Sequence, residues 1–206
     1  MAARRRNRLR LDERRRQLLE LGIELFSGRS YDEIPIGEIA RAAGISKGLL
    51  YHYFPSKRVF YVAAVRYAAE QMLHTIESAS INGGAGVDGL RSGLDAFIAY
   101  VEEHAVAYRT LIKSGAADPD VAEIVEDARQ RFMLQITTGA GLAQTPAALL
   151  IALAGWIGFV EAASLEWLVS RSITREALRE LMVAALLGAV SSTTSELLPM
   201  RAARVQ

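Results

Sequence analysis

The sequence lacks cysteine altogether and has only three histidines and five prolines among its 206 residues. Without cysteine the chain has no disulfide, no thiolate metal site and no cysteine nucleophile. The histidines are never three or four residues apart, so a histidine-rich metal site is not expected. Residues 84–89 fit a glycine-rich dinucleotide pattern, but they follow a predicted helix and not a strand. We therefore expect no metal, no other cofactor and no enzymatic activity.

Long apolar runs are also missing. The N-terminus has arginines with no apolar stretch behind them, which is not typical of a secretory signal. The longest apolar run, residues 147–160, stops at Glu161, short of the roughly 20 residues that span a bilayer. We expect a cytoplasmic protein with no membrane partner.

The net charge of +1 conceals an uneven distribution. Residues 1–60 carry thirteen Lys and Arg against seven Asp and Glu, a balance of +6. Residues 61–206 carry eleven against sixteen, a balance of −5. This asymmetry indicates an anionic partner for the N-terminal part alone, which a nucleic acid or a membrane surface would satisfy.

Helical periodicity dominates the chain, and no alternating strand pattern is present. The breakers and capping residues divide it into about nine helices, which predicts an all-α protein. The expected helices are residues 11–27, 36–43, 46–54, 57–78, 87–103, 105–114, 119–138, 146–170 and 174–197.

Two short helices around residues 36–54 are joined by a tight turn behind a longer helix, which is the helix-turn-helix arrangement. Gly44 permits the left-handed backbone of the turn, and Ser46 is placed to cap the second helix. Ala40 is small where the helices cross. The apolar positions that lock the pair against the first helix are Ile39, Ile45, Leu50 and Phe54.

The other face of the second short helix predicts DNA contact. Lys47, Gly48, Tyr51 and His52 fall on one exposed stripe that offers a cation, a bare backbone, a hydroxyl and an imidazole. Lys57 adds charge at the start of the next helix, beside amides that favour phosphate. The alternative is a helix-turn-helix that serves only packing.

An arginine-rich arm precedes the first helix. It either follows a DNA groove or its phosphates, or remains a solvated tail. Its arginines are Arg4, Arg5, Arg6, Arg8 and Arg10.

The stretch from Arg16 to Val62 resembles the DNA-binding domain of TetR-family transcriptional regulators. The resemblance is carried by Ile-Ala-Arg-Ala-Ala-Gly-Ile-Ser-Lys-Gly at 39–48 and Tyr-His-Tyr-Phe-Pro-Ser-Lys at 51–57. It implies a dimer that usually represses transcription until a small molecule binds its C-terminal domain. Ser30, Pro35 and Leu49 depart from the family pattern. The predicted DNA contacts are Arg4, Arg5, Arg6, Ser46, Lys47, Gly48, Leu49, Tyr51, His52 and Lys57.

The helix predicted at residues 146–170 is apolar on every side, so every side should be buried and one should meet a second subunit. The last helix carries a similar set of small and apolar residues. The two helices are predicted to form a four-helix bundle with their copies, and the alternative is an internal core. The predicted interface residues are Gly155, Gly158, Ala162, Leu181, Ala185, Gly188 and Ala189.

Glu161 lies in an apolar face, where a charge is costly unless it is paired. It would meet either a polar group of a ligand or an arginine, of which Arg109 and Arg129 are candidates. Aromatic residues of the same half either line an apolar effector pocket or simply form core. The effector candidates are Tyr100, Tyr108, Phe132, Trp156, Phe159, Glu161 and Trp167.

The sequence thus predicts a DNA-binding domain at 1–55, a connecting helix at 56–80 and an effector-binding and dimerisation domain at 81–206. The predicted function is a regulator, most simply a repressor, released from a palindromic DNA operator by a small apolar effector. The alternatives are a DNA-binding or architectural protein without an effector, and an all-α enzyme that uses the C-terminal half.

Overall fold

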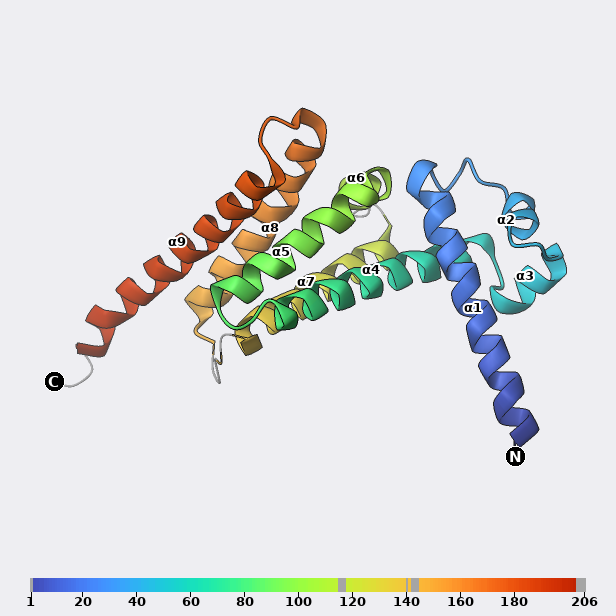
Figure 1. The fold of residues 1–206 in the computed structure, drawn as a ribbon, viewed down its shortest axis with the longest axis horizontal. Coiled ribbons are helices and arrows are strands. Elements are labelled where there is room, and N and C mark those ends of the chain that lie inside the picture. The colour runs from blue at the N-terminus through green and yellow to red at the C-terminus, as the bar shows by residue number, and fades with distance from the viewer. Residues whose placement is uncertain (1, 115–117, 140, 142–144, 203–206) are drawn as a thin grey trace. The chain divides into compact units, whose positions relative to one another are not determined.

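The computed structural model describes the backbone of residues 2–114, 118–139, 141 and 145–202, and side chains within 11–112, 118–139, 141 and 145–192. Over these ranges it has nine helices and no strand, which confirms the all-α class (Figure 1). The helices are α1 (Ala2–Gly28), α2 (Ile36–Ala42), α3 (Lys47–Tyr53), α4 (Lys57–Asn82), α5 (Val87–Glu103), α6 (Ala105–Ser114), α7 (Pro119–Gly139), α8 (Ala147–Ser170) and α9 (Arg175–Ala202).

Three helices are longer than predicted. The backbone of the arginine arm belongs to α1, which begins at Ala2 and not at residue 11. Ala, Arg and Leu are good helix formers and no breaker separates the arm from α1, so the helix extends through it. No glycine or proline interrupts residues 79–82 either, and α4 runs on to Asn82 instead of ending at residue 78. α9 runs on to Ala202 through Pro199, which a breaker rule does not predict.

The chain divides into two compact units. One unit is Met1–Gln71 with His104–Val125, and the other is Met72–Glu103 with Glu126–Gln206. Both α4 and α7 contribute to each unit. This division by contacts does not coincide with the predicted boundaries at residues 55 and 80, because α6 and the start of α7 pack with the N-terminal helices.

The core of the first unit is formed by α1, α2, α3 and the first turns of α4. Its nine buried residues are Leu18, Leu19, Ile34, Ile39, Ala40, Leu50, Phe54, Phe60 and Ala64. Gly22 lies where α1 crosses α4, and a Cβ there would be 2.9 Å from the Ala64 Cβ and 2.9 Å from the Phe60 Cζ. The glycine therefore allows the close approach of the two helices.

The turn between α2 and α3 has the predicted chemistry. Gly44 has a φ of +65°, the left-handed conformation that glycine adopts without strain. The Ser46 side chain caps α3 by accepting a hydrogen bond from the Leu49 amide at 3.1 Å. Pro35 precedes α2 with no side-chain cap, and Ser56 caps α4 through the Val59 amide at 3.1 Å. These local interactions fix how α3 is presented.

In the second unit α8 and α9 lie side by side, with α5 against them (Figure 1). Two indole groups of α8 join it to the chain that follows. The Trp156 Nε1–H donates to the Met182 carbonyl at 2.8 Å, and the Trp167 Nε1–H donates to the Ile173 carbonyl at 2.8 Å. Both indoles are buried, so these bonds satisfy donors that would otherwise be costly.

α8 is long and apolar enough to cross a membrane, judged by length and composition alone. Only 33% of its most apolar stretch is buried within the single chain. Its buried residues face α9 and α5, and Glu161 on it forms a charged pair with Arg129. One side of α8 thus packs on α9 and α5, and the other apolar side is uncovered in the single chain.

Candidate nucleic-acid interface

The outward face of α3 carries the residues that the sequence assigns to DNA contact. Leu49 and Tyr51 are 42% and 44% exposed, although both are large side chains that favour burial. Ser46, Lys47, Gly48 and His52 are exposed as well. Leu50, on the opposite side of α3, is fully buried and anchors the helix to the core. The fold therefore turns one face of α3 to solvent and holds it rigidly from behind.

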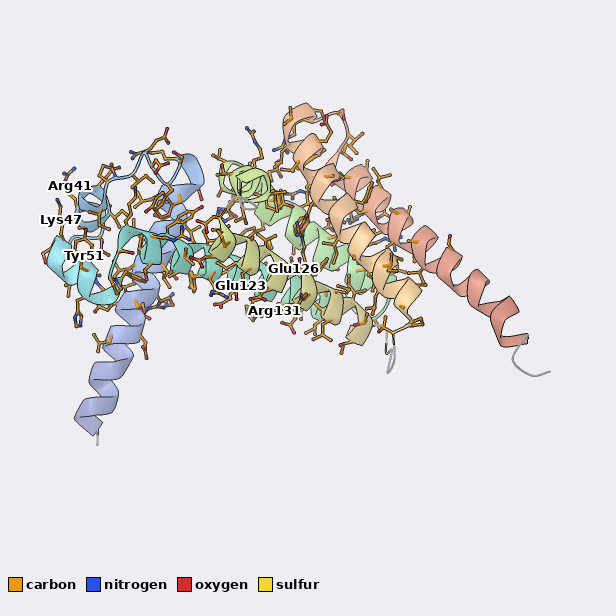
Figure 2. The ribbon with its side chains drawn as sticks, turned by 180° about the vertical axis from the view of Figure 1, so that it is seen from behind. Arg41, Lys47, Tyr51, Glu123, Glu126 and Arg131 are labelled. Atoms are coloured by element: carbon orange, nitrogen blue, oxygen red, sulfur yellow. The ribbon has the colours of Figure 1, made fainter. Side chains whose placement is uncertain are left out.

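Arg41 adds a cation that the sequence analysis did not single out. It lies in the last turn of α2, is exposed, and shares an outer edge with Lys47 and Tyr51 (Figure 2). The tight turn folds the end of α2 back toward α3, because the Ile45 amide donates to the Ala40 carbonyl at 3.0 Å. In the sequence, the position of Arg41 about one helical turn before Gly44 could have identified this cation. Arg41 extends the basic face onto α2.

Lys47 is supported by an unexpected neighbour. Its aliphatic stem crosses Gly37 of α2 so closely that a Cβ at Gly37 would lie 2.6 Å from the Lys47 Cε. The Lys47 ammonium lies 3.1 Å from the same position. The Lys47 side chain therefore packs along α2, although Lys47 as a whole is exposed to solvent.

Lys57, the first residue of α4, is half-buried and sits against an aromatic ring. Its ammonium lies 4.1 Å from the centroid of the Tyr31 ring. A cation over an aromatic face is attracted by the ring quadrupole, which restricts the flexible side chain. Lys57 is thus a partly ordered charge at the N-terminus of α4.

Several N-terminal arginines serve the fold itself. Arg14 donates to the Ala43 carbonyl at 3.0 Å and holds the turn before α3 from the side of α1. The Arg15 guanidinium lies 5.1 Å from the centroid of the Phe54 ring. Part of the positive excess of residues 1–60 is therefore structural. The side chains of Arg4, Arg5 and Arg6 lie outside those that the structure describes.

Arg58 connects the start of α4 with the start of α7. Its guanidinium donates to both carboxylate oxygens of Asp118 at 2.7 and 2.9 Å, and to Asp120 at 2.6 Å. The Arg58 hydrogen bonds lower the pKa of Asp118, with help from the amides of α7 that it caps. Arg58 is consequently engaged within its own unit.

Acidic residues follow one another along the first half of α7, and four of them are exposed: Asp120, Glu123, Glu126 and Asp127. Glu123, Glu126 and Arg131 lie along α7 in Figure 2, and all three are exposed. Among the residues that the structure describes, no group of three or more acidic or histidine side chains is arranged to hold a metal ion.

The effector candidates are distributed over both units. Tyr108 is buried in the first unit, and the other six belong to the second. The Phe132 and Trp156 rings stack with centroids 6.0 Å apart, and Phe159 is 36% exposed. Burial raises the pKa of Tyr100 to about 12, with a smaller contribution from Glu103. The indole N–H groups of Trp156 and Trp167 already donate hydrogen bonds to backbone carbonyls of the chain.

Glu161 is paired with Arg129, one of the two arginines considered from the sequence. The Arg129 Nε and Nη2 donate to the two Glu161 oxygens, each at 2.8 Å. The Glu161 side chain is only 16% exposed, so the two-pronged pair neutralises a charge inside the second unit. The pairing accounts for a carboxylate on an otherwise apolar helix.

The predicted interface residues lie largely on the uncovered faces of α8 and α9. Gly155, Gly158 and Gly188 have no atom within 4 Å of an added Cβ, and Ala162 and Leu181 are exposed. Ala185 and Ala189 are half-buried. Other large apolar residues, not among the predicted interface residues, are exposed on these helices: Ile151 at 74% and Val169 at 66% on one side of α8, and Leu187 at 45% on α9.

Comparisons with known proteins agree with this geometry. Residues 18–64 match the family model described as "Bacterial regulatory proteins, tetR family", and residues 87–196 match "Tetracyclin repressor-like, C-terminal domain". The second match alone covers more than half of the chain.

Two curated relatives match over part of their length. The HTH-type transcriptional activator FasR of Mycolicibacterium smegmatis is 34% identical over 62% of this chain and 58% of its own. The negative regulator of the biofilm operon icaADBC, IcaR of Staphylococcus aureus, is 29% identical over 42% of this chain and 47% of its own. The chain thus spans about half the length of these relatives.

A solved structure matches more of the chain. A tetR-family transcriptional regulator from Streptomyces coelicolor is 30% identical, covers 90% of this chain and 83% of its own, and superposes with a TM-score of 0.79. FadR from Bacillus subtilis, solved in complex with stearoyl-CoA, superposes with a TM-score of 0.66 at 14% identity, which shows likeness of fold alone.

Proposed function

The chain belongs to the TetR family of transcriptional regulators, and from that premise we propose that it binds a palindromic DNA operator as a homodimer and represses transcription. Release by a small, largely apolar effector is part of the proposal. It is a regulator and not an enzyme. A protein of this kind works in the cytoplasm, where its DNA lies.

The exposed face of α3 carries the proposal. Tyr51 and Leu49 are large, exposed and held on a helix whose far side is buried, which suits contact with base edges in a major groove. Arg41 and Lys47 lie on the same edge as Tyr51 and supply positive charge for phosphates (Figure 2), and Lys57 adds a cation at the start of α4. The combination of an exposed tyrosine, an exposed leucine and neighbouring cations fits a DNA-facing surface better than a surface that serves only packing.

The uncovered faces of α8 and α9 support dimer formation. Ile151, Gly155, Gly158 and Ala162 recur at helical spacing along one side of α8, and Leu181 and Gly188 do so on α9. Small residues let helices approach closely, and the larger ones supply apolar area at their margins. A second copy of the chain would cover both faces as a four-helix bundle. Two DNA-reading helices would then contact successive major grooves, about 34–36 Å apart.

The effector is proposed to bind in the C-terminal part of the chain. Support comes from its half-buried aromatic side chains, Tyr100 and Phe132, which belong to one compact unit. The polar side chain nearest in type to a ligand anchor, Glu161, is already neutralised by Arg129. An uncharged or weakly polar effector suits such surroundings better than a strongly charged one.

Activation is the second candidate, because the relative at 34% identity is named a transcriptional activator. Repression and activation share the same DNA-binding and dimer surfaces. They differ in where the operator lies relative to the promoter, so transcription from the bound promoter separates them.

The test is titration of the purified protein onto labelled DNA from beside its own gene, with a shuffled sequence as control. Specific binding should weaken steeply with salt, since Lys and Arg release counterions from the phosphates. Tyr51→Ala should remove the preference for the specific DNA while circular dichroism stays unchanged, because Tyr51 is exposed. Unchanged preference in that variant would show that α3 does not read the DNA. Transcription assays on the same fragment then assign repression or activation.

A further inference from the structure

The contact between Lys47 and Gly37 links a DNA-facing cation to a helix that is not itself the reading helix. Lys47 is the first residue of α3, and Gly37 is the second residue of α2. The lysine side chain crosses the place where a side chain of residue 37 would begin, at 2.6 Å from Cε and 3.1 Å from Nζ. Only glycine leaves this space open, because any Cβ there would overlap the lysine stem.

Confinement of a lysine side chain before binding has a direct energetic effect. A free lysine loses up to about 2 kcal/mol of rotamer freedom when it is ordered in a contact. A side chain that already lies along α2 loses less of that freedom on binding, which is the general benefit of preorganisation. Among the described residues Lys47 forms no ion pair, so its charge stays available.

We propose that Gly37 is a positioning residue for DNA binding, which acts by holding the Lys47 ammonium at the shared edge of α2 and α3. This edge also carries Arg41 and Tyr51 (Figure 2). This inference rests on the proposed operator binding. It adds Gly37 to the residues on which DNA binding depends, although Gly37 has no side chain that could contact a phosphate or a base. Lys47 makes the phosphate contact, and Gly37 decides where its ammonium lies.

The substitution Gly37→Ala separates positioning from folding. The atoms that the new Cβ meets belong to the far end of a flexible side chain, which moves at little cost. Alanine is also a better helix former than glycine by up to about 1 kcal/mol. The variant should therefore fold as stably as the original chain while Lys47 is displaced.

The experiment is a double-mutant cycle on the full-length chain with operator DNA. The four proteins are the original chain, Gly37→Ala, Lys47→Ala and the double variant. Gly28→Ala is the control, because Gly28 ends α1 in the same unit with nothing within 4 Å of an added Cβ. Affinity is measured at several salt concentrations, and thermal unfolding is recorded for each protein.

Lys47→Ala should lower the salt slope by about 2 per dimer, one phosphate contact for each protomer, and the affinity by roughly 10- to 100-fold at 0.1 M salt. Gly37→Ala should reproduce most of both losses without a lower melting temperature. In the Lys47→Ala background the same alanine should have no further effect, since its only route is through the lysine.

The inference is overturned if Gly37→Ala binds like the original chain, binds more tightly, or adds its full loss to that of Lys47→Ala. In each of those cases the original chain still prefers its operator over shuffled DNA, so the proposed function survives. If the original chain shows no such preference, the proposed function fails and the role of Gly37 fails with it.

Discussion

Replacing Leu181 by glutamate is expected to split the proposed dimer while each protomer stays folded. Leu181 is 48% exposed on α9, so a partner subunit could bury about half of its side chain. Full burial of a leucine contributes about 1.5 to 3 kcal/mol, and the exposed half therefore about 1 kcal/mol. Two-fold symmetry doubles that loss to about 2 kcal/mol.

The carboxylate adds a second loss. An unpaired charge brought against an apolar surface loses hydration, and a further 1 kcal/mol or so per protomer is a low estimate. The total of about 4 kcal/mol corresponds to a roughly 1,000-fold weaker dimer. The protomer should be little affected, because substitutions at exposed sites change stability by about 0.5 kcal/mol or less.

Sedimentation velocity over a broad concentration range measures this shift directly. Leu134→Glu is the matched control, because Leu134 is 65% exposed on α7 and lies outside the predicted interface. The Leu181 variant should sediment as a monomer where the control remains a dimer, with the same circular dichroism. A Leu181→Glu protein that stays as dimeric as the control would refute the assignment of this face.

Three further substitutions test the packing, the charge and the titration. Gly22→Val places atoms against Phe60, so overpacking of about 1 to 3 kcal/mol should lower the melting temperature by roughly 3 to 10 °C. Tyr31→Leu removes the ring under Lys57 and should weaken operator binding about 3-fold per protomer. Burial raises the pKa of Tyr100 from 10.0 to about 12, so the unfolded chain loses its phenol proton first and stability falls as pH rises through this window. Tyr100→Phe should flatten that fall in urea unfolding.

Each of these has a comparison that isolates the cause. Gly28→Ala should not lower the melting temperature, since no atom lies within 4 Å of its added Cβ and alanine favours the helix. Tyr31→Phe keeps the ring and should bind like the original chain, and equal loss in both variants would exclude the ring contact as the reason. If Tyr100→Phe loses stability with rising pH as steeply as the original chain, groups other than Tyr100 cause the loss.

The helix-turn-helix was predictable because its signals are local. The left-handed turn at Gly44, the cap at Ser46 and the break at Pro55 each act within a few residues, and the observed bounds of α2 and α3 agree closely with the predicted ones. Periodicity likewise separated the buried Leu50 from the exposed Tyr51.

Contacts between distant residues could not be predicted in the same way. Sequence reasoning left Glu161 with either a polar group of a ligand or an arginine such as Arg109 or Arg129, and only the packing of α7 against α8 selects Arg129. The bond from Arg58 to Asp118 spans 60 residues and leaves no periodic signal. The crossing of Lys47 over Gly37 depends on the angle between two short helices, which composition does not encode.

The apolar character of α8 was evident from the sequence, but its uncovered side was not. The sequence emphasised the small residues Gly155 and Gly158, whereas the structure adds Ile151 and Val169 as large exposed side chains on the same helix. Which side remains open depends on where α9 and α5 pack, and that is a property of the assembled unit.

Footprinting of the purified protein on operator DNA, with the number of bound protomers determined in parallel, tests the two-fold reading of DNA by α3 most directly. Two protomers should protect two symmetry-related half-sites on one face of the duplex, about 34–36 Å apart or a multiple of that spacing. Tyr51→Ala should abolish both protected regions together. Protection of a single site by one protomer, or protection that survives in Tyr51→Ala, would contradict DNA recognition by paired α3 helices.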